Sequence, residues 1–148
     1  MYKRQAEDEG VAFAETLAGK YGHVDYDTIP GVIYTWPELA SVGITEEQAK
    51  QRKLDYRVGK FPFMANGRAV ASDETEGFVK LVFDAKYGEL LGAHLLGSQA
   101  TELIAELVMA KKLEATEEEI IHAMHPHPTY SEAVMEAAGQ VLGESIHI

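Results

Sequence analysis

Three strand-like segments follow one another in the middle of the chain, at residues 54–63, 78–84 and 90–96. The first two are rich in β-branched and aromatic residues, which fit a pleated, half-buried surface, and the third is mainly leucine. The apolar positions of the first segment change parity at Gly59, which predicts a β-bulge there. The other two segments are joined through "AKYG", a typical hairpin signal. Because hairpins join antiparallel strands, the sequence predicts a mainly antiparallel sheet.

Helical patterns surround these segments. An apolar stripe at helical spacing runs through residues 6–18, and small residues within it predict close packing against a flat surface. A second and stronger stripe runs from Ser98 to Leu113. Capping boxes at residues 45–48, 116–119 and 129–132 predict the starts of three further helices.

The order of these elements predicts the class of fold. One more strand is expected over Val32 to Trp36, ended by Pro37, and "MANGRAVA" at residues 64–71 is interpreted as a turn before a short helix. Together the elements predict an α+β fold, a mainly antiparallel sheet flanked by helices. The composition changes near residues 25–31, so we expect residues 1–28 to form an appendage and residues 29–148 to form the domain.

The charge and the cysteine content limit the kinds of molecule that the protein is expected to bind. The 148 residues carry 24 acidic and 13 basic side chains, a formal net charge of −11. Nucleic acid and anionic membrane surfaces are therefore disfavoured, whereas a basic protein partner is favoured. The chain has no cysteine, which excludes disulfides, thiolate catalysis and cysteine metal sites within it and fits a cytoplasmic setting. No apolar run reaches the roughly 18 residues of a membrane span.

The segment "HAMHPHPTYSEAVMEAA" at residues 122–138 contains the strongest candidates for catalytic residues. Glu132 admits two interpretations. As part of a capping box it would bond the backbone N–H of Thr129, whereas as a catalytic partner it would lie about 2.6–3.2 Å from a ring nitrogen of His127. A helix N-terminus disfavours a charged imidazole and a nearby carboxylate favours it, and such opposing influences suit an acid–base catalyst.

A metal site is not expected among His122, His125 and His127. The prolines at 126 and 128 hold the preceding residues extended, so neighbouring side chains tend to point apart. No carboxylate or cysteine stands at a spacing that would complete a coordination shell. Trp36 is expected to be buried or half-buried.

Five segments, in the same order along the chain, resemble one protein family. They are "IPGVIYTWPELASVG" (29–43), "KFPFMANGRA" (60–69), "GFVKLVFD" (77–84), "LLGAHLLGSQATELI" (90–104) and "HPHPTYSE" (125–132). They resemble the C-terminal interface domain of the pyridine nucleotide–disulfide oxidoreductases, in particular their dihydrolipoamide dehydrogenase branch. "AEDEG" (6–10) resembles the helix that closes the flavin domain of that family. A GxGxxG motif and the family's redox cysteine pair are absent, so the resemblance implies an interface (dimerisation) domain with residues 1–28 left from the flavin-binding domain.

The resemblance also implies roles for single residues. His127 would be the acid–base histidine that one subunit of a homodimer inserts into its partner's active site, and Glu132 would orient it. The main chain at His127 and Pro128 would touch the partner's flavin. The parent enzyme would oxidise dihydrolipoamide through a disulfide and FAD to NAD, whereas this chain alone would bind neither cofactor and be inactive. Relatives have cis peptide bonds at the positions of Trp36-Pro37 and His127-Pro128, so both bonds are predicted to be cis.

Two alternatives remain open. The domain could be a non-catalytic interaction module that docks the basic peripheral-subunit-binding domain of a lipoyl-bearing acyltransferase, which the acidic charge balance suits. The same acyltransferase is the expected partner of the parent enzyme. The domain could also come from a sister flavin disulfide reductase, such as a mercuric or glutathione reductase. "HPTxSE" alone does not separate these, although the segments between residues 29 and 104 favour the lipoamide enzyme.

Overall fold

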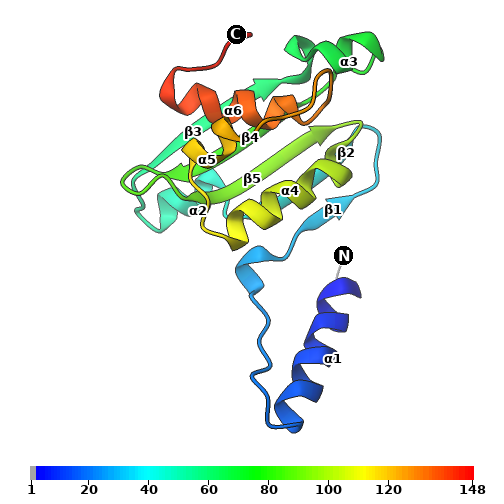
Figure 1. The fold of residues 1–148 in the computed structure, drawn as a ribbon, viewed down its shortest axis with the longest axis vertical. Coiled ribbons are helices and arrows are strands. Elements are labelled where there is room, and N and C mark those ends of the chain that lie inside the picture. Colours follow the sequence, from blue (N-terminus) through cyan, green and yellow to red (C-terminus); the bar gives the residue numbers. More distant parts are fainter. Residues whose placement is uncertain (1–2) are drawn as a thin grey trace.

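A computed structural model describes residues 3–148 and shows one five-stranded sheet (Figure 1). The strands are ordered β1-β2-β5-β4-β3, and each neighbouring pair is antiparallel. In chain order the elements are α1 (Lys3–Leu17), η1 (Tyr26–Thr28), β1 (Gly31–Ile33), β2 (Glu38–Gly43), α2 (Glu46–Gln51), β3 (Tyr56–Pro62), η2 (Phe63–Ala65), α3 (Gly67–Ala71), β4 (Phe78–Asp84), β5 (Leu90–Gly97), α4 (Ala100–Lys112), α5 (Glu117–His122) and α6 (Glu132–Leu142). The predicted α+β class is confirmed.

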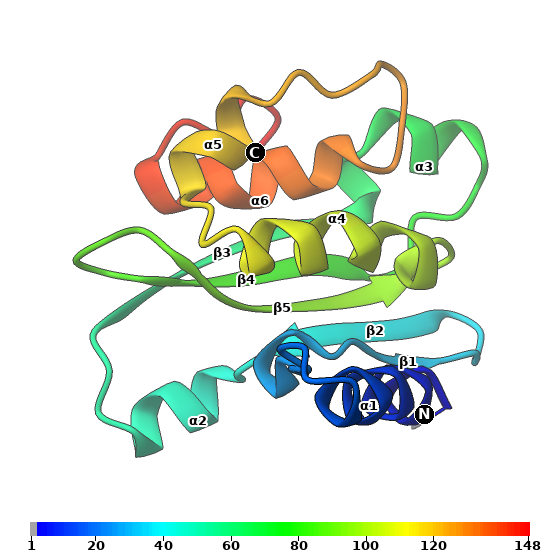
Figure 2. The same cartoon turned by 60° about the horizontal axis from the view of Figure 1, so that its bottom comes forward.

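Most of the helices lie on one face of the sheet. Figure 2 shows α3, α4, α5 and α6 above the strands and α2 below them. The alternate residues of β3, β4 and β5 that face the upper helices are fully buried, among them Phe61 of β3, Leu81 and Phe83 of β4 and Leu95 of β5. Burying a side chain of this size stabilises a fold by about 1.5–3 kcal/mol. This shared core fixes α6, and therefore the residues at its start, relative to the sheet.

The β-bulge predicted at Gly59 is wrong. Strands β3 and β4 pair without interruption, with Gly59 opposite Leu81, and the irregularity lies instead between Val82 and Phe83 of β4. Gly59 is needed because α6 crosses the strand there. A Cβ at this position would overlap the carbonyl oxygen of Ala137, so the glycine allows close approach of the helix rather than a bend of the strand.

The region around Pro37 also differs from expectation. The predicted strand over residues 32–36 is shorter, and a second strand, β2, follows the proline and pairs with both β1 and β5. Proline cannot donate a hydrogen bond to a neighbouring strand, and this costs little at the point where a strand begins. Pro37 therefore precedes a strand here rather than ending one. Trp36 is 71% exposed, and its expected burial is wrong. Both predicted cis bonds, Trp36-Pro37 and His127-Pro128, are present.

The predicted capping boxes form to different degrees. Thr45 exchanges both bonds with Gln48, and Glu119 accepts hydrogen bonds from the backbone and hydroxyl of Thr116. The third box forms only in part, because the hydroxyl of Thr129 donates to the Pro126 carbonyl instead of accepting from the helix. Helix α6 accordingly begins at Glu132, later than the box predicted.

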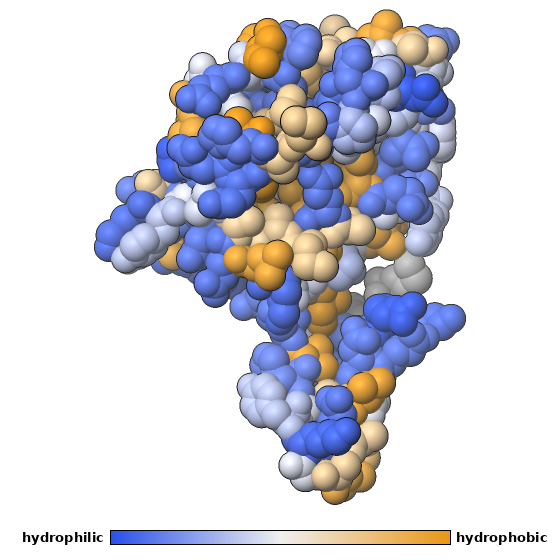
Figure 3. All heavy atoms as spheres, in the orientation of Figure 1, coloured by the Kyte–Doolittle hydropathy of each residue, from blue (hydrophilic) through white to orange (hydrophobic). Residues whose placement is uncertain are grey.

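Helix α1 stands apart from the rest of the domain (Figure 1). None of its residues from Lys3 to Leu17 is buried. A cleft of about 590 Å³ separates it from α4, with Val11, Val108 and Met109 among its lining residues. Apolar side chains are visible along this helix and beside the cleft in Figure 3. Within residues 3–148, no helix is both long and apolar enough to span a membrane.

Candidate functional site

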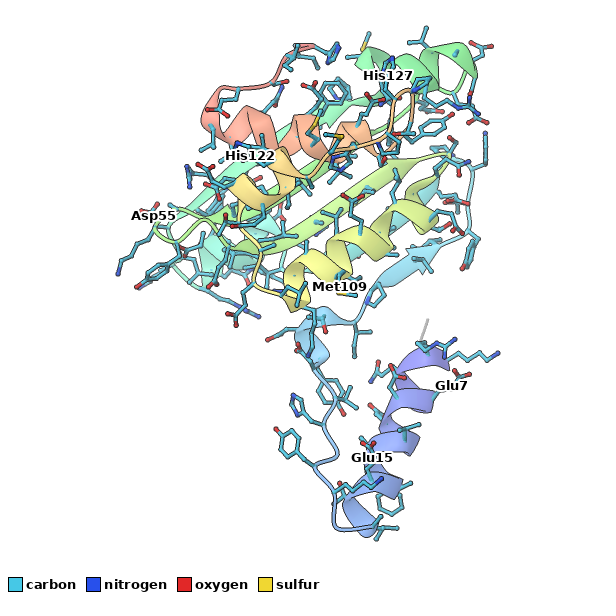
Figure 4. The ribbon with its side chains drawn as sticks, in the orientation of Figure 1. Glu7, Glu15, Asp55, Met109, His122 and His127 are labelled. Carbon is cyan, nitrogen blue, oxygen red and sulfur yellow. The ribbon has the colours of Figure 1, made fainter. Side chains whose placement is uncertain are left out.

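His127 lies on the loop that connects α5 to α6. Figure 4 shows the loop rising to the end of the molecule where α3 lies, with His127 near its tip and His122 at the end of α5. The imidazole is 77% exposed. Within residues 3–148 no hydrogen bond reaches its Nε2 atom, nor the main-chain N–H and C=O of the same residue. The ring is therefore available to a group outside the described part of the chain.

Glu132, the first residue of α6, makes both of the contacts that the sequence left as alternatives, the capping bond to Thr129 and the bond to His127. One carboxylate oxygen lies 2.8 Å from Nδ1 of His127, and the other accepts the backbone N–H of Thr129, also at 2.8 Å. The distance expected of a catalytic partner is thus confirmed, and the capping contact is present as well. The carboxylate is 18% exposed, so it is fixed by the helix start while the histidine beside it remains open to solvent.

The surroundings of Glu132 favour its ionised form. Burial alone would raise the pKa of this carboxyl, but the hydrogen bonds from Thr129 and His127 outweigh burial and lower its pKa below the ordinary value. An ionised carboxylate at Nδ1 holds the ring in one orientation and keeps a proton on that nitrogen. It also stabilises the imidazolium that forms when Nε2 takes up a proton. The pair can therefore exchange a proton through Nε2 at the surface.

Asn66 is a supporting residue that sequence reasoning missed. Its side chain is buried, caps α3 by accepting the N–H of Ala69 and donates to the backbone carbonyl of Thr129 at 3.0 Å. Next to this contact, the hydroxyl of Tyr130 donates to Glu74 at 2.6 Å. The sequence indicated the helix start at "NGRA" but carried no signal for the long-range bond. These contacts fix the downstream half of the His127 loop.

The three neighbouring histidines contact three different carboxylates. His122 lies 3.6 Å from Glu118, His125 lies 2.8 Å from Glu106, and His127 contacts Glu132. Across residues 3–148, no group of three or more possible ligands is placed to hold a metal ion. The sequence placed His127 and Glu132 together correctly, and it assigned no partner to His125.

The fold and the site together define a domain that presents an exposed histidine, bonded to a carboxylate, at its surface. It does not enclose the histidine among other reactive side chains, because His127 is exposed and its only side-chain partner in the described residues is Glu132.

Comparison with known families matches residues 29–138 to the dimerisation domain of the pyridine nucleotide-disulphide oxidoreductases. The chain belongs to this family, and its dimerisation domain implies a homodimer.

Individual relatives fall within the same group. Dihydrolipoyl dehydrogenase 1 (mitochondrial) of Arabidopsis thaliana is 53% identical over 148 residues, which are 100% of this chain and 29% of that protein. Leghemoglobin reductase of Glycine max is 53% identical over 93% of this chain and 26% of the relative. Among solved structures, the HOCl-induced flavoprotein disulfide reductase RclA of Escherichia coli has a TM-score of 0.79 and 28% identity, covering 88% of this chain and 31% of that one. The chain thus spans about three tenths of the length of the curated relatives it matches.

Proposed function

We propose that this chain is the dimerisation part of a dihydrolipoyl dehydrogenase and supplies His127 and Glu132 to the active site of the partner subunit. The hydrogen bond between Glu132 and Nδ1 of an otherwise exposed His127 is the observation that supports this proposal most strongly. The high identity to dihydrolipoyl dehydrogenases supports the choice of substrate. A relative of equal identity is named leghemoglobin reductase, so the substrate needs a direct test.

The role of His127 follows from the free Nε2 atom. Oxidation of a dithiol to a disulfide releases two protons and two electrons, and a histidine within reach of a thiol can accept one of the protons. Glu132 stabilises the resulting imidazolium through Nδ1, and the histidine then returns the proton to solvent or to a thiolate. General acid–base groups of this kind typically contribute about 10²–10⁴-fold to a rate.

FAD and NAD are the cofactors of the proposed parent enzyme, and they would take up the two electrons that the dithiol releases. The exposed backbone at His127 and Pro128 fits contact with the polar edge of a flavin, because the N–H and C=O of His127 have no partner within residues 3–148. This chain has no cysteine and no GxGxxG motif. We therefore propose that the flavin and disulfide belong to other domains, that residues 1–28 derive from the flavin-binding domain, and that this chain alone is inactive.

A chimera tests the proposal. Residues 1–148 would replace the matching C-terminal segment of Arabidopsis dihydrolipoyl dehydrogenase 1, and the dimer would be assayed with dihydrolipoamide and NAD. We expect an active chimera that loses about 10²–10⁴-fold in kcat on His127→Gln and less on Glu132→Gln. His122→Gln, an exposed histidine on α5, is the matched control. A folded, dimeric chimera that is inactive, or one indifferent to His127→Gln, would contradict the proposal.

A substrate panel separates the proposal from its alternatives. Glutathione disulfide or mercuric ion as the better substrate would indicate a sister reductase. We also propose that the parent serves a lipoyl-bearing acyltransferase in the cytoplasm and docks its basic peripheral-subunit-binding domain, which the net charge of −11 favours. Titration of this chain with that domain measures the docking, and tight binding without any effect of His127 on turnover would favour a non-catalytic interaction module.

A further inference from the structure

His125 stands two residues before His127 and has a very different environment. Its side chain is 5% exposed, whereas that of His127 is 77% exposed. Nδ1 of His125 lies 2.7 Å from the backbone carbonyl oxygen of Ala123, and Nε2 lies 2.8 Å from a carboxylate oxygen of Glu106 on α4. Both ring nitrogens therefore point at oxygens, and the ring has almost no contact with solvent.

The two oxygens determine the protonation state of the ring. A carbonyl oxygen only accepts hydrogen bonds, and so does an ionised carboxylate. A neutral imidazole carries one N–H and can satisfy only one of them, whereas an imidazolium carries two. A buried ring with acceptors at both nitrogens is therefore best satisfied when it is doubly protonated.

The hydrogen bond between His125 and Glu106, called the tie below, attaches the part of the loop that precedes His127. Downstream of His127, the chain is held by Asn66 at Thr129 and by the start of α6. Upstream, the contact with Glu106 joins the loop to α4, a different helix of the same layer. His127 lies between the two anchors, and its main-chain N–H and C=O have no hydrogen-bond partner within residues 3–148.

We propose that His125 is held as an imidazolium by Glu106 and the Ala123 carbonyl, and that it is a positioning residue which ties the His127 loop to α4. The proposal rests on the proposed function only where it concerns catalysis, because the protonation state can be measured without any activity. The charged groups that face His125 are Glu106 from α4 and Glu132 from α6. Both are acidic and both favour the positive charge.

The electrostatics agree with this geometry. The hydrogen bond to Glu106 raises the pKa of His125 above the ordinary value, burial opposes it, and the Ala123 carbonyl and the charge of Glu132 add to the rise. A folded-state pKa that is raised gives stability that is fully present below the unfolded value and lost as the pH rises through the folded one. The tie should therefore be strongest below the ordinary histidine pKa of about 6.5 and weaken as the pH rises through the raised pKa of His125.

Nitrogen NMR of the 148-residue chain tests the protonation state. We expect both ring nitrogens of His125 to show the protonated pattern below a titration midpoint that lies above the ordinary histidine value of about 6.5, and this midpoint to move to lower pH in Glu106→Gln. Glu118→Gln removes an equal charge beside His122 on α5 and should leave His125 unchanged. A midpoint at or below the ordinary value, or a midpoint that Glu106→Gln does not change, would overturn the proposal.

Hydrogen exchange and turnover test the positioning role. Loss of one anchoring bond should speed exchange of the Thr129 N–H by about tenfold in Glu106→Gln and leave it unchanged in Glu118→Gln. In the chimera, Glu106→Gln should lower kcat by less than His127→Gln does, and this loss should shrink in alkaline solution, where the tie weakens in the unmodified chimera as well. If exchange and turnover match the parent, the positioning role is refuted. If His127→Gln is harmless while His125 is an imidazolium, the proposed function fails and the protonation assignment stands.

Discussion

Helices α1 and α6 have similar sequence patterns, but α6 is packed against the domain and α1 has no buried residue. Both combine an apolar stripe with small residues at helical spacing. In α6 the stripe is buried, and it includes Ala133, Val134, Ala137, Ala138 and Gly139. In α1 no described residue is buried, and nothing lies within 4 Å of a Cβ added at Gly10. A stripe of small residues thus indicates close packing but not the surface that a helix packs against.

The difference matters for the site. Helix α6 rests on β3 at Gly59, and its first residue is the carboxylate that holds His127. The position of Glu132 is therefore determined by the core of the domain. Helix α1 has no comparable support, because none of its residues is buried and several of them line an open cleft.

The largest expected effect comes from adding one methyl group under α6. Gly59→Ala should lower the free energy of unfolding by about 1–3 kcal/mol, because the new Cβ overlaps the Ala137 backbone, which cannot yield without shifting the helix. Gly10→Ala is the matched control. It meets no atom and should leave the main denaturant transition unchanged while adding helix propensity to α1. Equal effects of the two variants would contradict the contrast between the helices.

A smaller effect is expected from a buried carboxylate on α6. Glu136 accepts hydrogen bonds from the hydroxyl of Ser145, the N–H of Ile146 and Nδ1 of His147, at 2.6, 3.0 and 2.5 Å, and so holds the last residues of the chain against the helix. Glu136→Gln should cost about 0.5–1.5 kcal/mol, because glutamine keeps one acceptor oxygen but loses the charge, and it should speed hydrogen exchange at Ile146. The control is Glu9→Gln on α1, where the carboxylate accepts hydrogen bonds from Gln5 and Tyr26 alone among residues 3–148.

The same carboxylate predicts a pH dependence. Burial would raise the pKa of Glu136, but the bonds from Ser145 and His147 outweigh it and lower the pKa. A depressed folded-state pKa gives stability that is present above the unfolded value, about 4.3, and lost as the pH falls through the folded one. Denaturant midpoints measured from pH 7 downward should therefore converge for the wild type and Glu136→Gln in acid. A constant gap between them would rule out this origin.

Much of the fold could be predicted from local patterns. The strands over residues 54–63, 78–84 and 90–96 and the helix over residues 98–113 carry strong periodicity, and each is present with small changes at its ends. Strand β2 could not be recognised in the same way, because it follows Pro37 and owes its structure to pairing with β1 and β5 on both sides. The role of Gly59 likewise depends on a helix almost eighty residues later in the chain.

The site was predictable to a similar extent. The short spacing between His127 and Glu132 allowed their contact to be predicted, and the structure has it. The supporting contacts were out of reach, because Asn66 bonds Thr129 across 63 residues and Glu106 bonds His125 across 19. A side chain that acts through such long-range bonds leaves no local pattern in the sequence.

Helix α6 fixes the position of Glu132, and Glu132 orients His127 through a hydrogen bond to Nδ1. Determining the tautomer of His127 tests this relation most directly. Nitrogen NMR of the neutral ring in alkaline solution reports which ring nitrogen keeps its proton. We expect the proton on Nδ1 in the wild type, with Nε2 unprotonated and free to accept, and loss of that preference in Glu132→Gln. A wild-type ring protonated mainly on Nε2, or a tautomer indifferent to Glu132→Gln, would show that Glu132 caps the helix and does not direct the histidine.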